Sequence, residues 1–171
     1  MMRPFFVVGI IISSLALPLA IFAGPREMFL RGELKFLDFQ NPAPEYMLSV
    51  DTRARLKEHF LSTYNKTLAS LIRLEHEAGR IERALSAREL TEDSEQLRTK
   101  LAYSRTRIAE AQDALDSIKI EFEKILVADI RTTLRTRASR IIMRFEKEVA
   151  TPMRAAHTTL IGIVLKLKET Q

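Results

Sequence analysis

Residues 97–125 read LRTKLAYSRTRIAEAQDALDSIKIEFEKI, and this stretch decides the fold. Its apolar or small side chains return with alternating spacings of four and three residues. Such a seam predicts a long helix that supercoils against a partner helix. The seam residues are Leu97, Leu101, Ser104, Ile108, Ala111, Leu115, Ile118, Phe122 and Ile125.

The helical pattern extends in both directions from this seam. From Glu45 to Thr151 the chain contains no proline and a single glycine, Gly79. We expect a first helix over 51–85, capped by Ser49 or Asp51, and a second over 94–150. At 1.5 Å per residue these helices would be ~52 Å and ~85 Å long, so the second would extend beyond the first. The apolar face of the first comprises Leu56, Phe60, Tyr64, Leu68, Leu71, Ala78, Ile81 and Leu85.

Residues 86–94 predict the turn between these helices. Ser86 and Glu89 have the spacing of a capping box, and a polar cluster follows over 91–95. A reversal of direction here gives a helical hairpin. The alternative is one uninterrupted rod, because this segment contains neither glycine nor proline.

The apolar row of the second helix changes phase near residue 130. Strict heptads would place Asp129 on the seam, so the row continues better through Leu126, Ile130, Leu134, Ala138, Ile142, Phe145 and Val149. We interpret the change as a stutter that locally unwinds the supercoil. Beyond it the second helix needs another surface, which predicts a protein partner or a homo-oligomer.

The flanks of the hairpin carry weaker patterns. Residues 29–40 predict a short strand, which the prolines of 41–44 end, and Thr151-Pro152 breaks or kinks the helix. Residues 163–168 alternate as in a short strand but also fit an amphipathic helical turn. The expected fold class is therefore all-α, a long helical hairpin or coiled coil over 49–150, with a lead-in over 24–48, a C-terminal strand or helix over 151–171 and two short flanking strands.

The first segment, 1–23, predicts export. Arg3 precedes an uncharged run from Pro4 to Ala23. This run is a cleaved signal peptide or a retained membrane anchor, since about twenty apolar residues can also span a bilayer. Either way residues 24–171 would face outward. We expect a periplasmic protein, or an inner-membrane-anchored protein that faces the periplasm.

Charge is unevenly distributed along the chain. There are 27 Lys and Arg against 22 Asp and Glu, for a net charge of +5. Acidic residues dominate 110–129, whereas basic residues dominate 131–154. The basic cluster is the candidate binding site for lipid or a protein partner, because guanidinium groups suit phosphates and carboxylates. Its members are Arg131, Arg135, Arg137, Arg140, Arg144 and Lys147.

Two interpretations of the basic cluster stay open. It is a solvated helix face with intrahelical ion pairs, or a surface for lipid phosphate or an acidic protein. An exported protein rarely meets nucleic acid, so we expect no nucleic-acid partner.

Enzymatic chemistry is not indicated. His59, His76 and His157 lack metal-ligand spacing, and no nucleophile elbow, phosphate-binding loop or dinucleotide motif occurs. The chain has no cysteine, which fits an oxidising or a reducing compartment. We predict no catalytic residue, metal or cofactor.

The order of parts resembles the Skp/OmpH family of periplasmic chaperones. Leu34–Gln40 is similar to the opening strand of that family, and Phe145–Ala150 with Ile163–Lys166 is similar to its closing helix and strand. The resemblance implies that strands of three subunits close a small body from which helical hairpins hang and enclose unfolded outer-membrane proteins. Leu34, Phe36, Ile163 and Leu165 would then build the body.

Two functions follow as hypotheses. The first is a soluble, trimeric holdase-type chaperone for unfolded envelope proteins, with a cleaved leader. The second is a membrane-anchored coiled-coil scaffold of an envelope machine, in which the basic cluster meets lipid headgroups or a partner helix.

Overall fold

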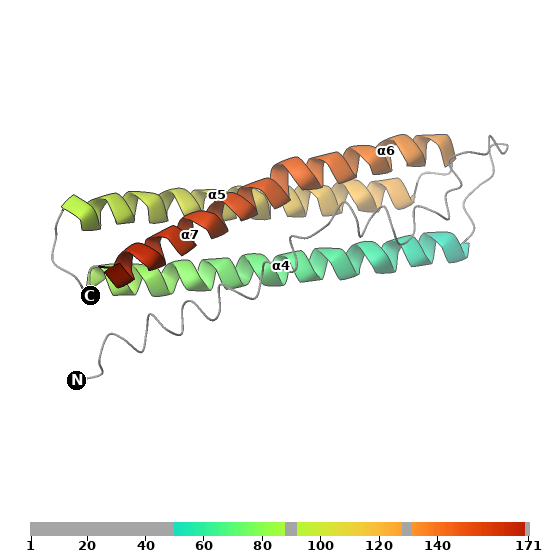
Figure 1. Cartoon of the computed structure of the whole chain (residues 1–171). Coiled ribbons are helices and arrows are strands. Elements are labelled where there is room, and N and C mark those ends of the chain that lie inside the picture. The colour runs from blue at the N-terminus through green and yellow to red at the C-terminus, as the bar shows by residue number, and fades with distance from the viewer. Residues whose placement is uncertain (1–49, 88–91, 128–130, 170–171) are drawn as a thin grey trace.

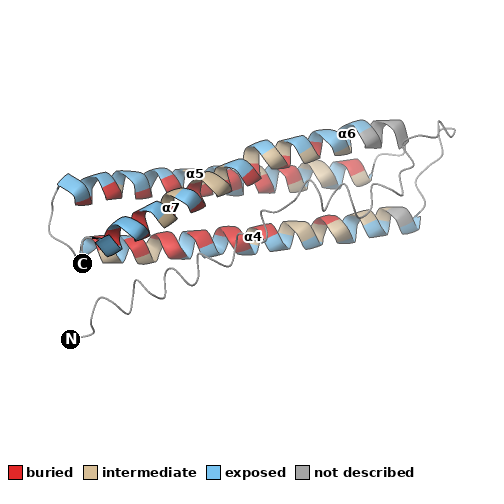
Figure 2. Cartoon of the chain, viewed as in Figure 1, coloured by how far each residue is buried: buried red, intermediate tan, exposed pale blue. Residues whose placement is uncertain are grey.

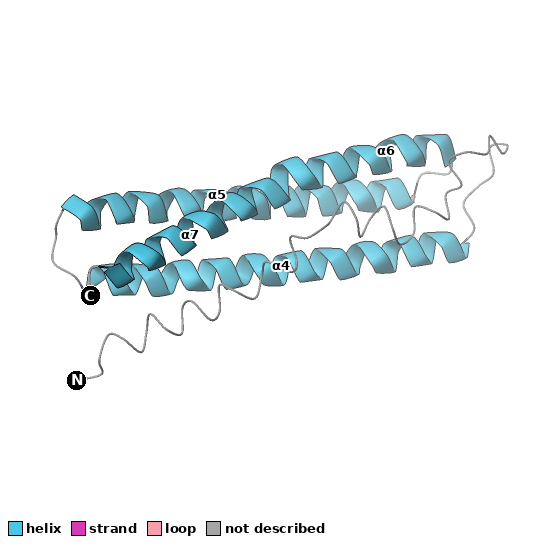
Figure 3. Ribbon diagram, in the orientation of Figure 1, coloured by secondary structure: helices cyan, strands magenta, loops and turns pink. Residues whose placement is uncertain are grey.

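The computed structural model describes residues 50–87, 92–127 and 131–169, without the side chains of 52 and 131–135. The elements are α4 (Val50–Ser86), α5 (Glu92–Leu126), α6 (Arg131–Arg144), the π-helix η2 (Phe145–Ala150) and α7 (Thr151–Glu169). Figure 3 shows helices and no strand over this part of the chain. The predicted leader and the predicted strand at 29–40 lie outside the described residues.

The helical hairpin is confirmed, because α4 and α5 pack side by side in opposite directions (Figure 1). In the first half of α4, the hydroxyl of Tyr64 donates a hydrogen bond to Oδ1 of Asp116 at 2.7 Å. Near its end, Arg98 donates to the carbonyl of Leu85 at 3.2 Å, which satisfies one of the last carbonyls of α4. A single uninterrupted rod is therefore excluded.

The prediction of one second helix over 94–150 is wrong. α5 ends at Leu126, and the helical segment that begins at Arg131 packs back along α5 and then also along α4. In Figure 1 this third rod, made of α6, η2 and α7, crosses the hairpin diagonally toward the end of α4. The phase change near residue 130 thus coincides with a gap between two helices that pack against each other rather than with a stutter inside one.

The reason for this reversal is the third apolar row. An open two-helix hairpin leaves a groove, and α7 fills it with a face of side chains spaced by three or four residues. Burial of a Leu or Ile side chain contributes roughly 1.5–3 kcal/mol, so closing the groove within the chain outweighs extension into solvent. The buried residues of α7 are Met153, Ala156, His157, Leu160, Ile163, Val164 and Leu167.

The core is a narrow column between the three rods, with buried faces turned inward in Figure 2. Its largest fully buried side chains come from every rod. They are Leu71, Leu74, Ile81, Leu85, Leu115, Ile118, Met153, Leu160, Ile163, Leu167 and Val149.

Residues 163–168 are helical, so the strand alternative for this segment is wrong. Ile163, Val164 and Leu167 are buried, whereas Leu165 is 52% exposed. This grouping follows the helical period of 3.6 residues rather than the two-residue period of a strand. With Ile163 in the core of the bundle and Leu165 outside it, neither is part of a strand.

The π-helix η2 keeps the buried apolar residues of the third rod on one face. The N–H and the hydroxyl of Thr151 both donate to the carbonyl of Glu146, five residues earlier. Buried Ile141, Phe145, Val149 and Met153 are each four residues apart, so on a plain α-helix they would drift around the axis. The wider turn returns them to one face, and the first turn of α7 then accommodates Pro152.

Candidate functional site

The predicted seam residues lie in the interior of the bundle. Phe122 is half-buried and stacks on Phe60 of α4. The others are buried where α5 packs against α4 and α7; they are Leu97, Leu101, Ser104, Ile108, Ala111, Leu115, Ile118 and Ile125. The structure therefore gives the seam two partners inside the same chain.

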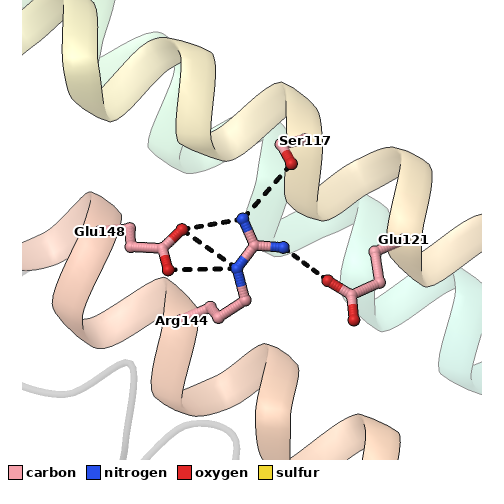
Figure 4. Close-up of polar contacts among 4 residues, drawn as sticks. All are labelled: Ser117, Glu121, Arg144 and Glu148. Atoms are coloured by element: carbon pink, nitrogen blue, oxygen red, sulfur yellow. Dashed lines mark hydrogen bonds and ion pairs between the residues drawn. The ribbon is translucent and has the colours of Figure 1, made fainter.

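Arg144 of the predicted basic cluster joins two rods (Figure 4). Its guanidinium donates to Glu121 of α5 at 2.6 Å and to both carboxylate oxygens of Glu148. A weaker bond reaches the hydroxyl of Ser117 at 3.3 Å. The side chains of Arg144 and Glu121 are 29% and 27% exposed, so this contact is partly shielded from solvent. Arg144 therefore joins α6 to α5 through an ion pair between the two rods.

We call Arg144 with Glu121 and Glu148 the clamp. The same contacts shift the pKa values of two of its members. Hydrogen bonds to Glu148 and then to Glu121 raise the pKa of Arg144 above its usual value. The hydrogen bond from Arg144 lowers the pKa of the Glu148 carboxyl. Both groups are therefore held in their charged forms near neutral pH.

Arg137, Arg140 and Lys147 are exposed on the outer face of the third rod. Spacings of three and seven residues place them along one stripe. Among the described residues, no acceptor forms a hydrogen bond or ion pair with any of the three. Arg131 and Arg135 belong to the first turns of α6, but their side chains are outside the description. The structure thus divides the cluster into a structural arginine and a solvent-facing stripe.

The exposed stripe lies at one end of the bundle. Arg144 contacts Glu121 and Phe60 stacks on Phe122, so residue 144 is level with about residue 60 of α4. The preceding residues of α6 continue toward the beginning of α4, past the end of α5 at Leu126. We call residues 50–60, 121–127 and 131–144 together the basic end.

Nearly all of the net charge of the described bundle is in the basic end. Nine basic and four acidic residues give it +5, whereas the remaining described residues carry thirteen basic and twelve acidic residues, for +1. Lys57, Lys124, Arg137 and Arg140 are exposed there and form no ion pair with another described residue. The rest of the bundle is close to neutral.

The basic end also holds the most exposed large apolar side chains of the described chain. They are Val50 at 86%, Val127 at 77% and Met143 at 66% exposure. Each comes from a different rod. Apolar side chains among basic ones are typical of surfaces that lie against lipid or protein.

Other candidate sites are weaker. No group of His, Cys, Asp and Glu within the described residues could hold a metal ion. An open groove of about 450 Å³ lies between the first turns of α5 and the last turns of α7, but the residues that line it include no histidine and a single acid, Asp93. Within the same residues, no helix has the length and hydropathy to cross a bilayer.

Comparison with protein-family models, curated proteins and solved structures found no match. The candidate site therefore depends on the geometry of this chain alone. The sequence located the basic cluster, and the four-residue spacing of Arg144 and Glu148 could have shown one ion pair. The contact with Glu121 required the chain reversal between Leu126 and Arg131, where the sequence showed only a phase change that we interpreted as a stutter.

Proposed function

We propose that this chain is a non-enzymatic, membrane-tethered scaffold of a bacterial envelope assembly, with the segment 4–23 as its anchor and the bundle outside the cytoplasm. The observation that carries the proposal is the return of the third rod along the hairpin. It closes the apolar groove and leaves a rigid rod with a charged exterior. A rigid rod of this kind can space and orient partner proteins.

The holdase is the second candidate. A long hairpin with exposed Ile72, Tyr103 and Ile120 offers apolar contacts to an unfolded client, which favours it. The resemblance to the Skp/OmpH family, however, implies that the C-terminal segment joins a separate oligomeric body. In this chain Ile163 and Leu167 instead pack within the bundle, so we rank the scaffold first.

Carbonate washing of native membranes, followed by intact mass of the chain, tests the first proposal. A scaffold with a retained anchor stays in the membrane at full mass. Release into the wash, with about twenty-three residues missing, would refute the tether.

A second assay separates the two candidates. The purified full chain is mixed with an unfolded outer-membrane protein, and aggregation is followed by light scattering. A holdase suppresses scattering near equimolar ratio, whereas a scaffold leaves it unchanged. Self-association stays a prediction for both candidates, and light scattering of the full chain in detergent would measure it.

A further inference from the structure

We propose that the basic end docks on the anionic headgroups of a phospholipid bilayer, so that the bundle stands end-on at the membrane. Arg137 and Arg140 are the principal contacts. This inference rests on the proposed tether and names the ligand of the candidate site.

The first argument is the placement of charge. The basic end carries +5, and the remainder of the described bundle carries +1. A charge of this kind at one end orients a rod toward an anionic surface, because each Lys or Arg near such a surface contributes about 1 kcal/mol. The exposed guanidinium groups also match the geometry of phosphate.

The second argument is the apolar component. Val50, Val127 and Met143 present exposed side chains from three rods at the same end as the basic residues. Basic residues mixed with exposed apolar ones suit the headgroup region, where charge meets phosphate and apolar groups reach the acyl boundary. The combination therefore fits a phospholipid surface, and the entry point of the chain then decides for lipid over an acidic protein.

The third argument is the entry point of the chain. α4 begins at Val50, so the segment that carries the proposed anchor enters the bundle at its basic end. A tether of 26 residues, 24–49, keeps this end within reach of the bilayer. Tethering makes docking an intramolecular event, so even a weak surface becomes occupied.

The test uses the full chain reconstituted in vesicles of phosphatidylcholine, with or without phosphatidylglycerol. The chain has no cysteine, so Met143→Cys and Leu165→Cys each give one labelling site. Both positions are exposed and apolar; Met143 lies in the basic end, and Leu165 lies 22 residues later, near the end of α7. An environment-sensitive fluorophore at each position, with headgroup-labelled quencher lipid, reports contact with the membrane surface.

Docking predicts that lipid quenches the fluorophore at position 143 in phosphatidylglycerol vesicles at low salt. This quenching should be absent in neutral vesicles and should disappear at high salt. The fluorophore at position 165 should not be quenched. Arg137→Gln with Arg140→Gln should lower the ratio of docked to undocked chain about fivefold per arginine, or roughly thirtyfold together. The matched control, Lys66→Gln with Arg73→Gln, removes the same charge from exposed positions on α4 and should leave the ratio unchanged.

Three results would overturn the inference: no quenching at 143 in anionic vesicles, equal quenching in neutral vesicles, or the arginine effect reproduced by the control pair. Competition by polyglutamate with no response to vesicles would also overturn it and assign the surface to an acidic protein. A chain that resists carbonate washing but shows no quenching at 143 refutes docking alone. A chain released by carbonate refutes the tether, whatever the vesicles report.

Discussion

The ring of Phe60 lies face to face with the ring of Phe122, with centroids 3.8 Å apart and planes inclined by 8°. Phe60 belongs to α4 and Phe122 to the last turns of α5, so the stack joins the two arms far from their turn. Tyr64 continues the contact through its bond to Asp116. Together these side chains fix which turns of the hairpin are opposite one another.

Replacing Phe60 by Ala is expected to destabilise the bundle by about 3 kcal/mol, because it removes a ring that is 4% exposed and leaves a cavity beside Phe122. Urea unfolding followed by circular dichroism measures the change. Ile72→Ala on the same helix is the control, since its side chain is 61% exposed and the loss should be within about 0.5 kcal/mol. Equal losses in the two variants would contradict this packing.

The clamp around Arg144 gives a second prediction. Arg144→Gln should destabilise the bundle by about 1 kcal/mol, because a charged hydrogen bond between two rods is lost at a partly exposed site. Arg140→Gln removes the same charge from an exposed position and should be nearly neutral. A double-mutant cycle with Glu121→Gln isolates the contact, and a coupling near zero would show that the clamp does not hold the rods together.

The hairpin was predictable because its signals are local. Heptad spacing over 97–125 identified one arm, and capping residues with a polar cluster identified the reversal before Glu92. The second reversal had neither a capping box nor a polar cluster, and its one local sign, the phase change of the apolar row near residue 130, also fitted a stutter inside one helix. Tertiary packing decides the second reversal, because α7 can bury its apolar row only by returning to the groove of the hairpin.

The candidate site was predictable in composition but not in geometry. The basic residues of α6 are evident in the sequence. That α6 lies beside the beginning of α4 depends on the chain reversal between Leu126 and Arg131. The sequence also could not separate Arg144, held by Glu121 and Glu148, from exposed Arg140. That separation depends on which arginine of α6 lies beside a carboxylate of α5, and the fold brings Glu121 to Arg144.

The pKa of Glu148 predicts an acid-sensitive contribution to stability. Its carboxyl has a folded pKa below the ordinary value of 4.5, so the stabilisation is present above pH 4.5 and is lost as the pH falls through the folded pKa. Glu148→Gln should therefore be less stable than the unmodified chain at neutral pH. The difference between their urea midpoints should close in acid, and a difference that is constant with pH would show that Arg144 does not hold this carboxyl charged.

The return of the third rod is the feature on which the proposed scaffold depends, and spin labels can test it directly. Lys100 of α5 and Lys166 of α7 both line the open groove between these two helices. Labels at Lys100→Cys and Lys166→Cys should therefore be separated by little more than the distance between the axes of packed helices, about 8–10 Å. Had α5 continued as one rod, 66 residues would hold these positions ~100 Å apart. Dilution with unlabelled chain is the control, because a short distance that survives dilution lies within one molecule. A short distance that disappears on dilution would mean that α7 packs on a neighbouring chain, and the bundle would then be an exchanged oligomer instead of a self-contained rod.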